Sequence, residues 1–374
     1  MALPASGQIS LSDVNVELSL SATATISMND TAVRTVFGQA SGAIDMNTGH
    51  GKSNMKYVSL STDATNQTIS LSAISGYVAG SSKITITVGT GVYIYSTSTS
   101  IAALTITGGV AGDQVTLINN GFILGMGGNG ADAQTNNGTS GTVGYPIANG
   151  SGAYLGFPGG PALSINYPIT IDNTNGAAYI AGGGGGGHAG YGAGGGGGAG
   201  GGKGGSGYSP SARSTWGAGG VGGGPGQAGT RADNTGLTNV SGSWLYSGGG
   251  GGGGRILPGV GGSGPDVRVN SPRGGSVQGF GGGAGGGAGS QHNQQPTWNN
   301  GEMAVVTGGS GNSPGHASLA GNSASGGGGW GAAGGAGGNS SSIAGAAGGK
   351  AVALNGNSVT WVSSDTTRVY GAVS

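Results

Sequence analysis

The chain has 374 residues, 96 of them glycine, and its 12 basic and 12 acidic side chains give a formal net charge of zero. This balance argues against nucleic acid as a partner, because neutralising phosphates requires a basic surface. Without cysteine there are no disulfides or thiolate metal sites, and without a leader or an apolar run of about 20 residues we expect no standard secretion signal and no membrane insertion.

Residues 1–56 hold the helix signals of this chain. Ser12 is a candidate N-cap for a first short helix. Asn29 or Asp30 could cap a second one that ends at Gly38. Because two helices this short cannot make a core alone, we predict a docking module that completes itself against a partner or sister subunits. The candidate attachment residues are Leu11, Asp13, Val14, Val33, Val36 and Phe37.

Residues 57–181 alternate apolar and small polar side chains with the period of two that is typical of strands. The clearest runs are 68–71, 83–88, 92–95 and 104–106. An internal repeat of roughly 54 residues follows, because residues 115–121 resemble residues 169–176. Residues 103–106 likewise resemble residues 162–165. The pattern predicts a β-rich, solenoid-like domain with stacked turns.

Most of the glycines follow Ile180, in runs such as Gly182–Gly187 and Gly248–Gly254. A flexible linker is one interpretation, but it gives no reason for tryptophans to recur between the runs. The alternative is the extended polyglycine II helix, which has no internal hydrogen bonds and must bond laterally to its neighbours. We therefore predict a bundle of polyglycine II helices over residues 182–349, and strands that form a cap over residues 350–374.

Taken together, these segments predict a mostly β protein with a polyglycine II helix bundle. A short helical docking module precedes the solenoid-like middle, and the C-terminal half is glycine-rich.

The connections between the glycine runs contain residue types that dominate binding surfaces. Trp, Tyr and Arg contribute most to binding hot spots, and the surrounding Ser, Asn and Gly resemble the composition of antibody loops. The candidate receptor-binding residues are Tyr208, Arg213, Trp216, Arg231, Trp244, Tyr246, Trp298 and Asn299. The alternative that these aromatic side chains only cover the ends of glycine helices stays open.

No motif indicates catalysis, a cofactor or a metal site. Gly51–Ser53 looks like the end of a phosphate-binding loop, but Met46 stands where that loop requires a glycine. The four histidines have no paired spacing, although a trimer axis could gather one from each chain. Glycoside cleavage needs two carboxylates across a groove, and nothing marks such a pair. We therefore expect a binding protein without catalytic residues or cofactors.

Both ends of the chain resemble proteins of tailed bacteriophages. Residues 7–15, 26–34 and 51–53 resemble an N-terminal module of tailed-phage structural proteins. Residues 356–361 and 368–372 resemble the terminal segment of glycine-rich fibre and tip proteins. The middle and the glycine-rich half are similar to the polyglycine-sandwich adhesins at the tips of long tail fibres in T-even-like phages.

This resemblance implies a virion protein of the tail or fibre that recognises a protein or polysaccharide on the host cell through loops between glycine helices. Its N-terminal module would bind other phage tail or baseplate proteins, as a homotrimer or docked on a trimeric fibre. A purely structural virion component, such as a fibre shaft or tail-tip spacer, is the alternative. Adsorption of the purified protein to host cells discriminates between the two.

Overall fold

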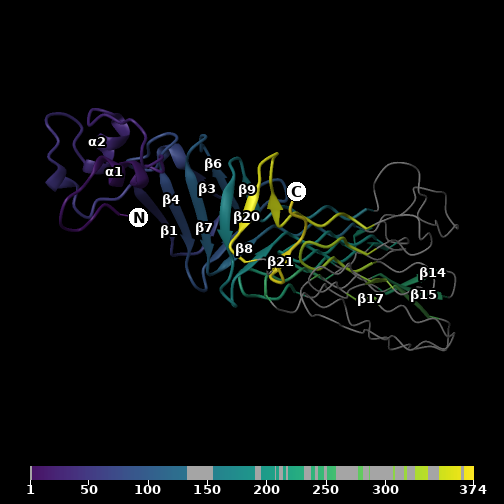
Figure 1. Ribbon diagram of the computed structural model, residues 1–374. Coiled ribbons are helices and arrows are strands. Elements are labelled where there is room, and N and C mark those ends of the chain that lie inside the picture. Colours follow the sequence, from purple (N-terminus) through teal and green to yellow (C-terminus); the bar gives the residue numbers. More distant parts are fainter. Residues whose placement is uncertain are drawn as a thin grey trace.

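The computed structural model describes most of the chain, namely residues 2–132, 155–189, 195–206, 218–230, 251–257, 286, 325–335, 345–363 and 366–374, together with the backbone of short strands between residues 208 and 317. An N-terminal module stands at one end, stacked strands follow, and extended glycine segments run away from the stack (Figure 1). Within the described residues, no helix has the length and apolarity needed to cross a bilayer.

The N-terminal module contains the helices α1 (Leu11–Glu17) and α2 (Thr31–Phe37) and the 3-10 turn η1 (Met46–Gly49). The prediction of Ser12 as N-cap is wrong. Ser10 caps α1, because its hydroxyl accepts the Asp13 N–H at 3.1 Å while the Asp13 carboxylate accepts the Ser10 N–H at 2.7 Å. The second helix is confirmed: it starts after Asp30 and ends at Gly38, whose φ of 68° favours glycine.

The expectation that this module lacks a core of its own is also wrong. The two helices bury Val14, Val33, Val36 and Phe37 against one another. Side chains from the connecting segments complete this cluster, namely Leu3, Ile9, Leu18, Ile26, Met28, Ala32, Ile44 and Met46. Irregular segments therefore contribute the apolar area that two seven-residue helices could not supply.

Three parallel sheets make up the stack that follows. The first sheet has the order β1 (Met55–Leu60), β4 (Lys83–Val88), β7 (Gln114–Asn119), β10 (Ile169–Asp172) and β20 (Val359–Trp361). The second has the order β2 (Ala64–Thr65), β5 (Tyr93–Tyr95), β8 (Phe122–Leu124), β11 (Tyr179–Ala181) and β21 (Val369–Tyr370). The third has the order β3 (Gln67–Ser70), β6 (Leu104–Thr107), β9 (Leu163–Ile165) and β19 (Val352–Ala353).

Consecutive strands contribute in turn to the three sheets, so each passage of the chain around the stack adds one strand to each. We call such a passage a coil. The repeated segments found in the sequence lie side by side, since Thr116 pairs with Thr170 and Leu104 pairs with Leu163. The predicted strands are confirmed, except that the first predicted run ends at Ser70 because Leu71 starts the 3-10 turn η2 (Leu71–Ala73).

The core of the stack lies between the three sheets. Alternate residues point into it, as in β4, where Ile84, Ile86 and Val88 are buried. Ile94, Leu104, Leu117, Ile123, Leu163, Ile171 and Ile180 extend this cluster along the stack. A fully buried side chain of this size contributes about 1.5–3 kcal/mol relative to leaving it exposed, so these ladders of Ile, Leu and Val hold the stack together.

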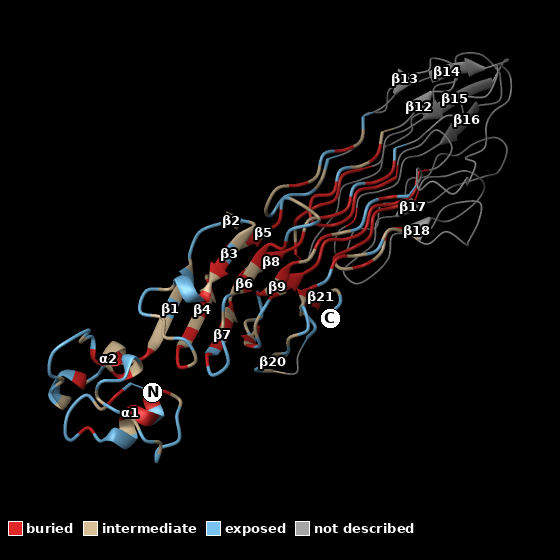
Figure 2. Cartoon of the chain, turned by 90° about the horizontal axis from the view of Figure 1, so that it is seen from above, coloured by how far each residue is buried: buried red, intermediate tan, exposed pale blue. Residues whose placement is uncertain are grey.

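The glycine segments leave the stack at two places, at Gly125 after β8 and at Gly182 after β11. They are buried along most of their described length (Figure 2). Residues 125–132 and 155–160 lie within the range that was expected to be β-rich, yet their backbones bond to glycine segments beyond Gly182. The described structure is thus mostly β with parallel sheets and few helices, as expected.

Further short strands lie within the glycine-rich half. They are β12 (Tyr208–Ser209), β13 (Ser214–Thr215), β14 (Leu237–Val240), β15 (Ser243–Ser247), β16 (Val277–Phe280), β17 (Val306–Thr307) and β18 (His316–Ala317). The segment after Lys350 returns to the stack, where β19, β20 and β21 extend the three sheets. These last strands agree with the strand pattern expected for residues 350–374.

Candidate functional site

Some of the predicted receptor-binding residues fall on strands of the glycine-rich half. Trp244 and Tyr246 belong to β15, which pairs antiparallel with β14 and parallel with β16. Tyr208 belongs to β12, which pairs with β13. In Figure 1, β14 and β15 lie at the end of the molecule remote from the N-terminal module. The other candidates lie outside the described residues, namely Arg213, Trp216, Arg231, Trp298 and Asn299.

The predicted attachment residues fall into two groups. Val14 and Val33 are fully buried, and Val36 and Phe37 nearly so, in the core of the N-terminal module. Asp13 caps α1. Asp13 and the four buried residues therefore stabilise the fold of the module. Leu11 differs, because its side chain is 45 % exposed.

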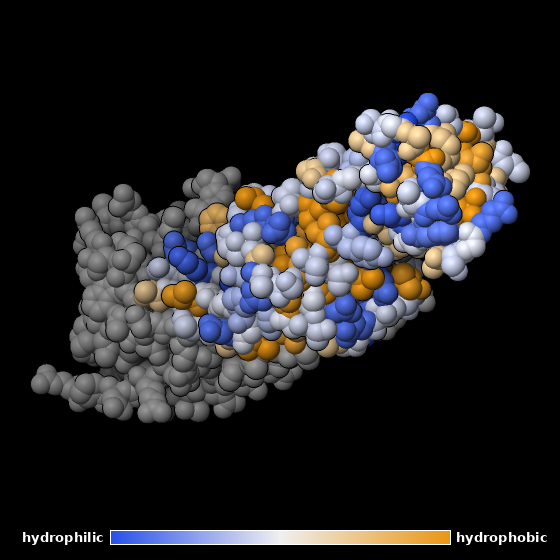
Figure 3. Space-filling model, turned by 90° about the vertical axis from the view of Figure 1, so that its left-hand side faces the viewer, coloured by the Kyte–Doolittle hydropathy of each residue, from blue (hydrophilic) through white to orange (hydrophobic). Residues whose placement is uncertain are grey.

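Two apolar residues that the sequence analysis missed accompany Leu11. Val16 is 44 % exposed and Leu20 is 42 % exposed, the first on α1 and the second just beyond it. We call Leu11, Val16 and Leu20 the α1 apolar surface. Figure 3 shows this end of the molecule, where apolar patches interrupt a largely polar exterior. The sequence shows that these residues are apolar but not that they face solvent. The structure shows it, because Val14 and Leu18 pack inward and these three do not.

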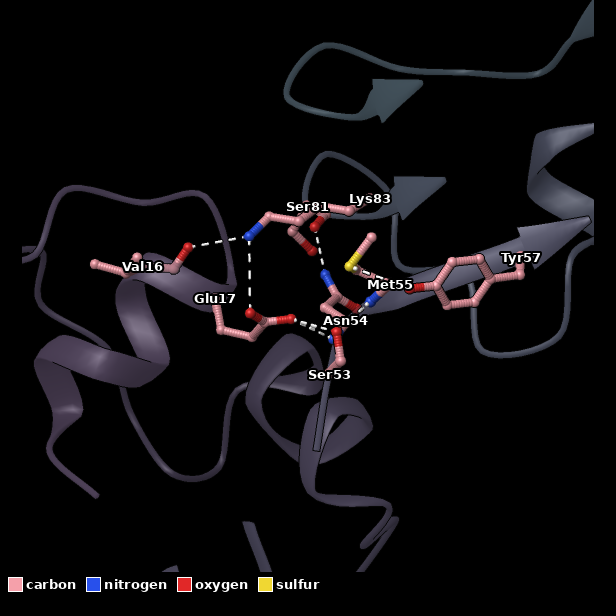
Figure 4. Close-up of polar contacts among 8 residues, drawn as sticks. All are labelled: Val16, Glu17, Ser53, Asn54, Met55, Tyr57, Ser81 and Lys83. Atoms are coloured by element: carbon pink, nitrogen blue, oxygen red, sulfur yellow. Dashed lines mark hydrogen bonds and ion pairs between the residues drawn. The ribbon is translucent and has the colours of Figure 1, made fainter. Parts of the chain in front are cut away.

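A buried polar junction joins the N-terminal module to the first coil (Figure 4). The Glu17 side chain is 1 % exposed, and its Oε1 atom accepts the Asn54 N–H at 2.7 Å and the Ser53 hydroxyl at 2.8 Å. Its Oε2 atom lies 3.9 Å from Lys83 Nζ on β4. A buried carboxylate is costly unless it is paired and hydrogen-bonded, so these contacts fix the module in one orientation on the stack.

The base of the glycine segments rests on the second sheet. Trp330 is fully buried there with Leu124 and Ala181, and its indole N–H donates to the Ile256 carbonyl at 3.2 Å. Four aromatic rings follow one another along the same sheet, with neighbouring centroids 4.4 to 6.0 Å apart, in the order Tyr93, Phe122, Tyr179 and Tyr370; the first three are stacked and the last is tilted. The rings and Trp330 together make an apolar floor under the glycine segments.

Arg255 fixes this floor from the side of the glycine segments. Its guanidinium lies 5.0 Å from the centroid of the Tyr95 ring and donates to the carbonyls of Gly223 at 2.7 Å and Ser96 at 3.1 Å. Burial lowers the pKa of Arg255 from its ordinary value, because the charge is removed from water. The backbone carbonyls and the ring face compensate for this desolvation, so Arg255 acts as a structural clamp.

The acidic and histidine side chains of the described residues are spread along the chain. No group of three or more His, Asp or Glu side chains that could hold a metal occurs among them. The Asp113 carboxylate accepts hydrogen bonds from the Tyr77 hydroxyl and from the N–H groups of Gly80, Ser82 and Val110, all of which lie in turns of the stack.

One family model and one solved structure are similar to this chain. The family model of the phage tail fibre adhesin Gp38 matches residues 53–244, just over half of the chain. Among solved structures, the chain is similar to the crystal structure of the gp37-gp38 adhesin tip complex of the bacteriophage S16 long tail fiber, with 15 % sequence identity, 99 % of this chain and 100 % of that chain covered, and a TM-score of 0.36. No curated protein matches the sequence.

Proposed function

The chain belongs to the phage tail fibre adhesin Gp38 family, and from this premise we propose that loops carried by a polyglycine scaffold bind a receptor on the host cell. The protein is a receptor-binding adhesin of the tail fibre and a component of the virion. Adhesins are binding proteins, so the function to be explained is recognition of the host cell and not catalysis.

The contacts between glycine segments support a polyglycine II scaffold. Gly128 N–H donates to the Gly184 carbonyl, Gly184 N–H to the Ala199 carbonyl, and Gly198 N–H to the Gly128 carbonyl, each at 2.8 Å. Three separate segments are therefore bonded to one another, as extended helices without internal hydrogen bonds require. A Cβ atom on Gly128 would overlap the Phe157 carbonyl, so the close approach depends on glycine.

The stack of parallel strands supports a solenoid-like carrier beneath this scaffold. Its neighbouring coils pair in register along each sheet, as in the pairing of β4 with β7 from Lys83 to Val88. A continuous apolar core fills its interior. Such a body is stiff, because each coil is held by its neighbours through backbone bonds and side-chain packing.

Receptor recognition is assigned to the connections at the remote end of the glycine segments. The composition of the connections between glycine runs in the sequence, with Tyr208, Trp244, Tyr246 and Trp298 among Ser, Asn and Gly, suits stacking and hydrogen bonding to a surface protein or polysaccharide. The 24 charged side chains of the whole protein leave little scope for recognition by charge.

Attachment to the virion is assigned to the N-terminal module. The residues of the α1 apolar surface, Leu11, Val16 and Leu20, are exposed apolar side chains on α1 or just after it. Covering exposed apolar side chains with a partner removes apolar area from water and favours association. The partner would be another phage tail or baseplate protein, with the adhesin as a homotrimer or docked on a trimeric fibre.

The observation that carries the proposal is the combination of the family match with a glycine scaffold whose interior is filled by backbone, which leaves the connections free to vary. The test is adsorption of the purified protein to host cells and its competition with phage infection. Trp244→Ala should weaken adsorption roughly thirtyfold, since truncating an aromatic anchor typically costs ~2 kcal/mol. Tyr57→Ala is the matched control, because Tyr57 is 70 % exposed on β1 of the stack.

If the parent protein does not adsorb to host cells, the alternative of a structural fibre shaft or tail-tip spacer is favoured. If the parent adsorbs and both Trp244→Ala and Trp298→Ala adsorb equally well, these aromatic residues only cover the ends of glycine helices, and recognition belongs to other connections.

A further inference from the structure

The connection that carries Trp244 begins and ends on two segments whose placement is described. Residues 226–230 precede this connection and residues 251–257 follow it. We call these two segments the legs and residues 231–250 the aromatic arm, because this stretch includes Trp244 and Tyr246. The place from which the aromatic arm extends therefore depends on how the legs are held.

Backbone hydrogen bonds join the two legs to each other. Gly226 N–H donates to the Arg255 carbonyl at 3.1 Å, and Arg255 N–H donates to the Gln227 carbonyl at 2.9 Å. Gly252 N–H donates to the Thr230 carbonyl at 3.0 Å. The bonded residue numbers rise along one leg as they fall along the other, so the legs are antiparallel. Thr230 and Gly252 thus close the base of the aromatic arm.

The side chain of Arg255 connects the legs to the stack. Arg255 is 8 % exposed, and its guanidinium donates to the Ser96 carbonyl at 3.1 Å and lies 5.0 Å from the centroid of the Tyr95 ring on β5. The same guanidinium donates to the Gly223 carbonyl at 2.7 Å and contacts Met126 Sδ at 3.0 Å. One side chain therefore holds the second leg to the second coil, to the segment after β8 and to a neighbouring glycine segment.

The space that the guanidinium occupies depends on a glycine. Gly201 has a φ of 85°, which favours glycine, and a Cβ atom added to it would lie 2.6 Å from Arg255 Cζ. The contacts also suit arginine in particular, because a planar guanidinium can donate to two carbonyls while it covers the face of an aromatic ring. A lysine ammonium cannot make all of these contacts at once.

We propose that Arg255 is a positioning residue for receptor binding, which fixes the legs against the stack and so sets the place from which the aromatic arm extends. The proposal rests on the proposed function for its link to the receptor. Aromatic side chains bind best when they are held in place beforehand, because ordering them on contact costs conformational entropy. Without the guanidinium, the legs keep their backbone pairing but lose their bonds to Ser96 and Gly223.

The first test measures adsorption to host cells and hydrogen exchange of Arg255→Met in the full-length protein. This change keeps a long apolar side chain and removes the guanidinium. Adsorption should fall roughly tenfold, or ~1.4 kcal/mol, and exchange should increase at the Gly226 and Gly252 amides but not in β4 or β7. Arg255→Lys should lie between the two proteins. Arg34→Met is the matched control, because Arg34 also donates to backbone carbonyls but belongs to the N-terminal module.

Combining Arg255→Met with Trp244→Ala decides whether Arg255 acts through the aromatic arm. If it does, its loss matters little once Trp244 is absent, and the double variant should adsorb about as weakly as Trp244→Ala alone, roughly thirtyfold below the parent. A general loss of folded protein would instead multiply the two effects to about three-hundredfold, and this result would overturn the proposal. Weaker adsorption of Arg255→Met beside normal adsorption of Trp244→Ala would overturn it as well.

Tyr95→Leu keeps the proposal testable if Arg255→Met does not fold. It removes the ring under the guanidinium but leaves both carbonyl bonds, so adsorption should fall about two- to fivefold and exchange at the Gly226 and Gly252 amides should increase. If the parent itself does not adsorb, the proposed function fails, but exchange in the legs still reports on Arg255. Unchanged exchange there in both variants would show that Arg255 does not hold the legs.

Discussion

At the scale of residues, Asp113 illustrates how single polar side chains hold neighbouring coils in place. Its Oδ1 atom accepts the Gly80 N–H at 3.0 Å and the Ser82 N–H at 3.2 Å, and its Oδ2 atom accepts the Tyr77 hydroxyl at 2.7 Å. The Tyr167 hydroxyl donates to its backbone carbonyl at 2.9 Å. Asp113 therefore connects the turn before β4 to the turn before β7 and to the segment before β10.

This cluster predicts a loss of stability at alkaline pH. Burial, together with the hydrogen bond to the Asp113 carboxylate, raises the pKa of Tyr77 from its ordinary 10.0 to about 12. The unfolded chain releases this proton first, so the contribution of Tyr77 is complete below about pH 10 and is lost as the pH rises towards about 12. Unfolding by urea at pH 8 to 12 should show a decline that is steeper for the parent than for Tyr77→Phe.

Tyr77→Phe should also be less stable than the parent at pH 8, because the Oδ2 atom of Asp113 loses the hydrogen bond from the Tyr77 hydroxyl. Burial likewise raises the pKa of Tyr93, Tyr167 and Tyr370, so both proteins decline and only the difference between them reports Tyr77. Parallel curves for the two proteins would contradict the prediction.

At the scale of elements, the turns that follow β7 and β10 are linked by buried asparagines. Asn119 Nδ2 donates to Asn173 Oδ1 at 2.8 Å and to the Tyr179 carbonyl at 3.2 Å, while Asn119 Oδ1 accepts the Gly121 N–H at 3.2 Å. The two asparagines occupy equivalent positions in the sequence repeat. Backbone groups in the turn are thereby satisfied by side chains, which lets the chain bend sharply between the first and second sheets.

Asn119→Ala should lower the free energy of unfolding by about 1–3 kcal/mol, because it leaves buried partners without a hydrogen bond. The double variant Asn119→Ala with Asn173→Ala should cost less than the sum of the single changes, since the two side chains bond to each other. Chemical unfolding measured by circular dichroism checks both statements. Strict additivity would mean that the bond between the asparagines contributes nothing.

At the scale of the whole molecule, the N-terminal module, proposed for attachment, and β14 and β15, proposed for recognition, lie at opposite ends of an elongated protein (Figure 1). The junction of Glu17 with Ser53, Asn54 and Lys83 fixes the N-terminal module on the first coil. The floor under Trp330 and the clamp of Arg255 hold the glycine segments on the second sheet. A force applied at one end is therefore transmitted through packed or hydrogen-bonded contacts along the described chain.

This arrangement predicts that attachment and host binding separate genetically. Replacing Leu11, Val16 and Leu20 together by serine should abolish incorporation into particles and leave adsorption of the free protein unchanged, because these side chains are exposed and lie outside the buried core of the module. Immunoblotting of purified particles and a cell-adsorption assay give the two measurements. The matched control Val362→Ser changes a valine that is 57 % exposed on the last coil and should be incorporated normally.

The sequence by itself determined the classes of local structure. Period-two alternation identified β4 to β6, and the strands near the C-terminus were expected from the same pattern. The resemblance of the two repeated segments anticipated their pairing, because equivalent residues in stacked coils face the same neighbours. Glycine runs separated by aromatic residues anticipated buried extended segments, since a linker would not need Trp330 beneath them.

Only the tertiary structure decided which residues face which partner. Leu11 and Val14 are both apolar residues of α1, yet Leu11 is exposed and Val14 is buried. The reason is that the second helix and the irregular segments around it cover only one side of α1. The pairing of β19 with β9 after the chain returns at Ala351 was not predicted, since it joins residues far apart in sequence. Local sequence patterns predict which residues form strands or helices and which are buried. The pairing of distant strands depends instead on which backbone N–H and C=O groups still need hydrogen-bond partners when the chain folds.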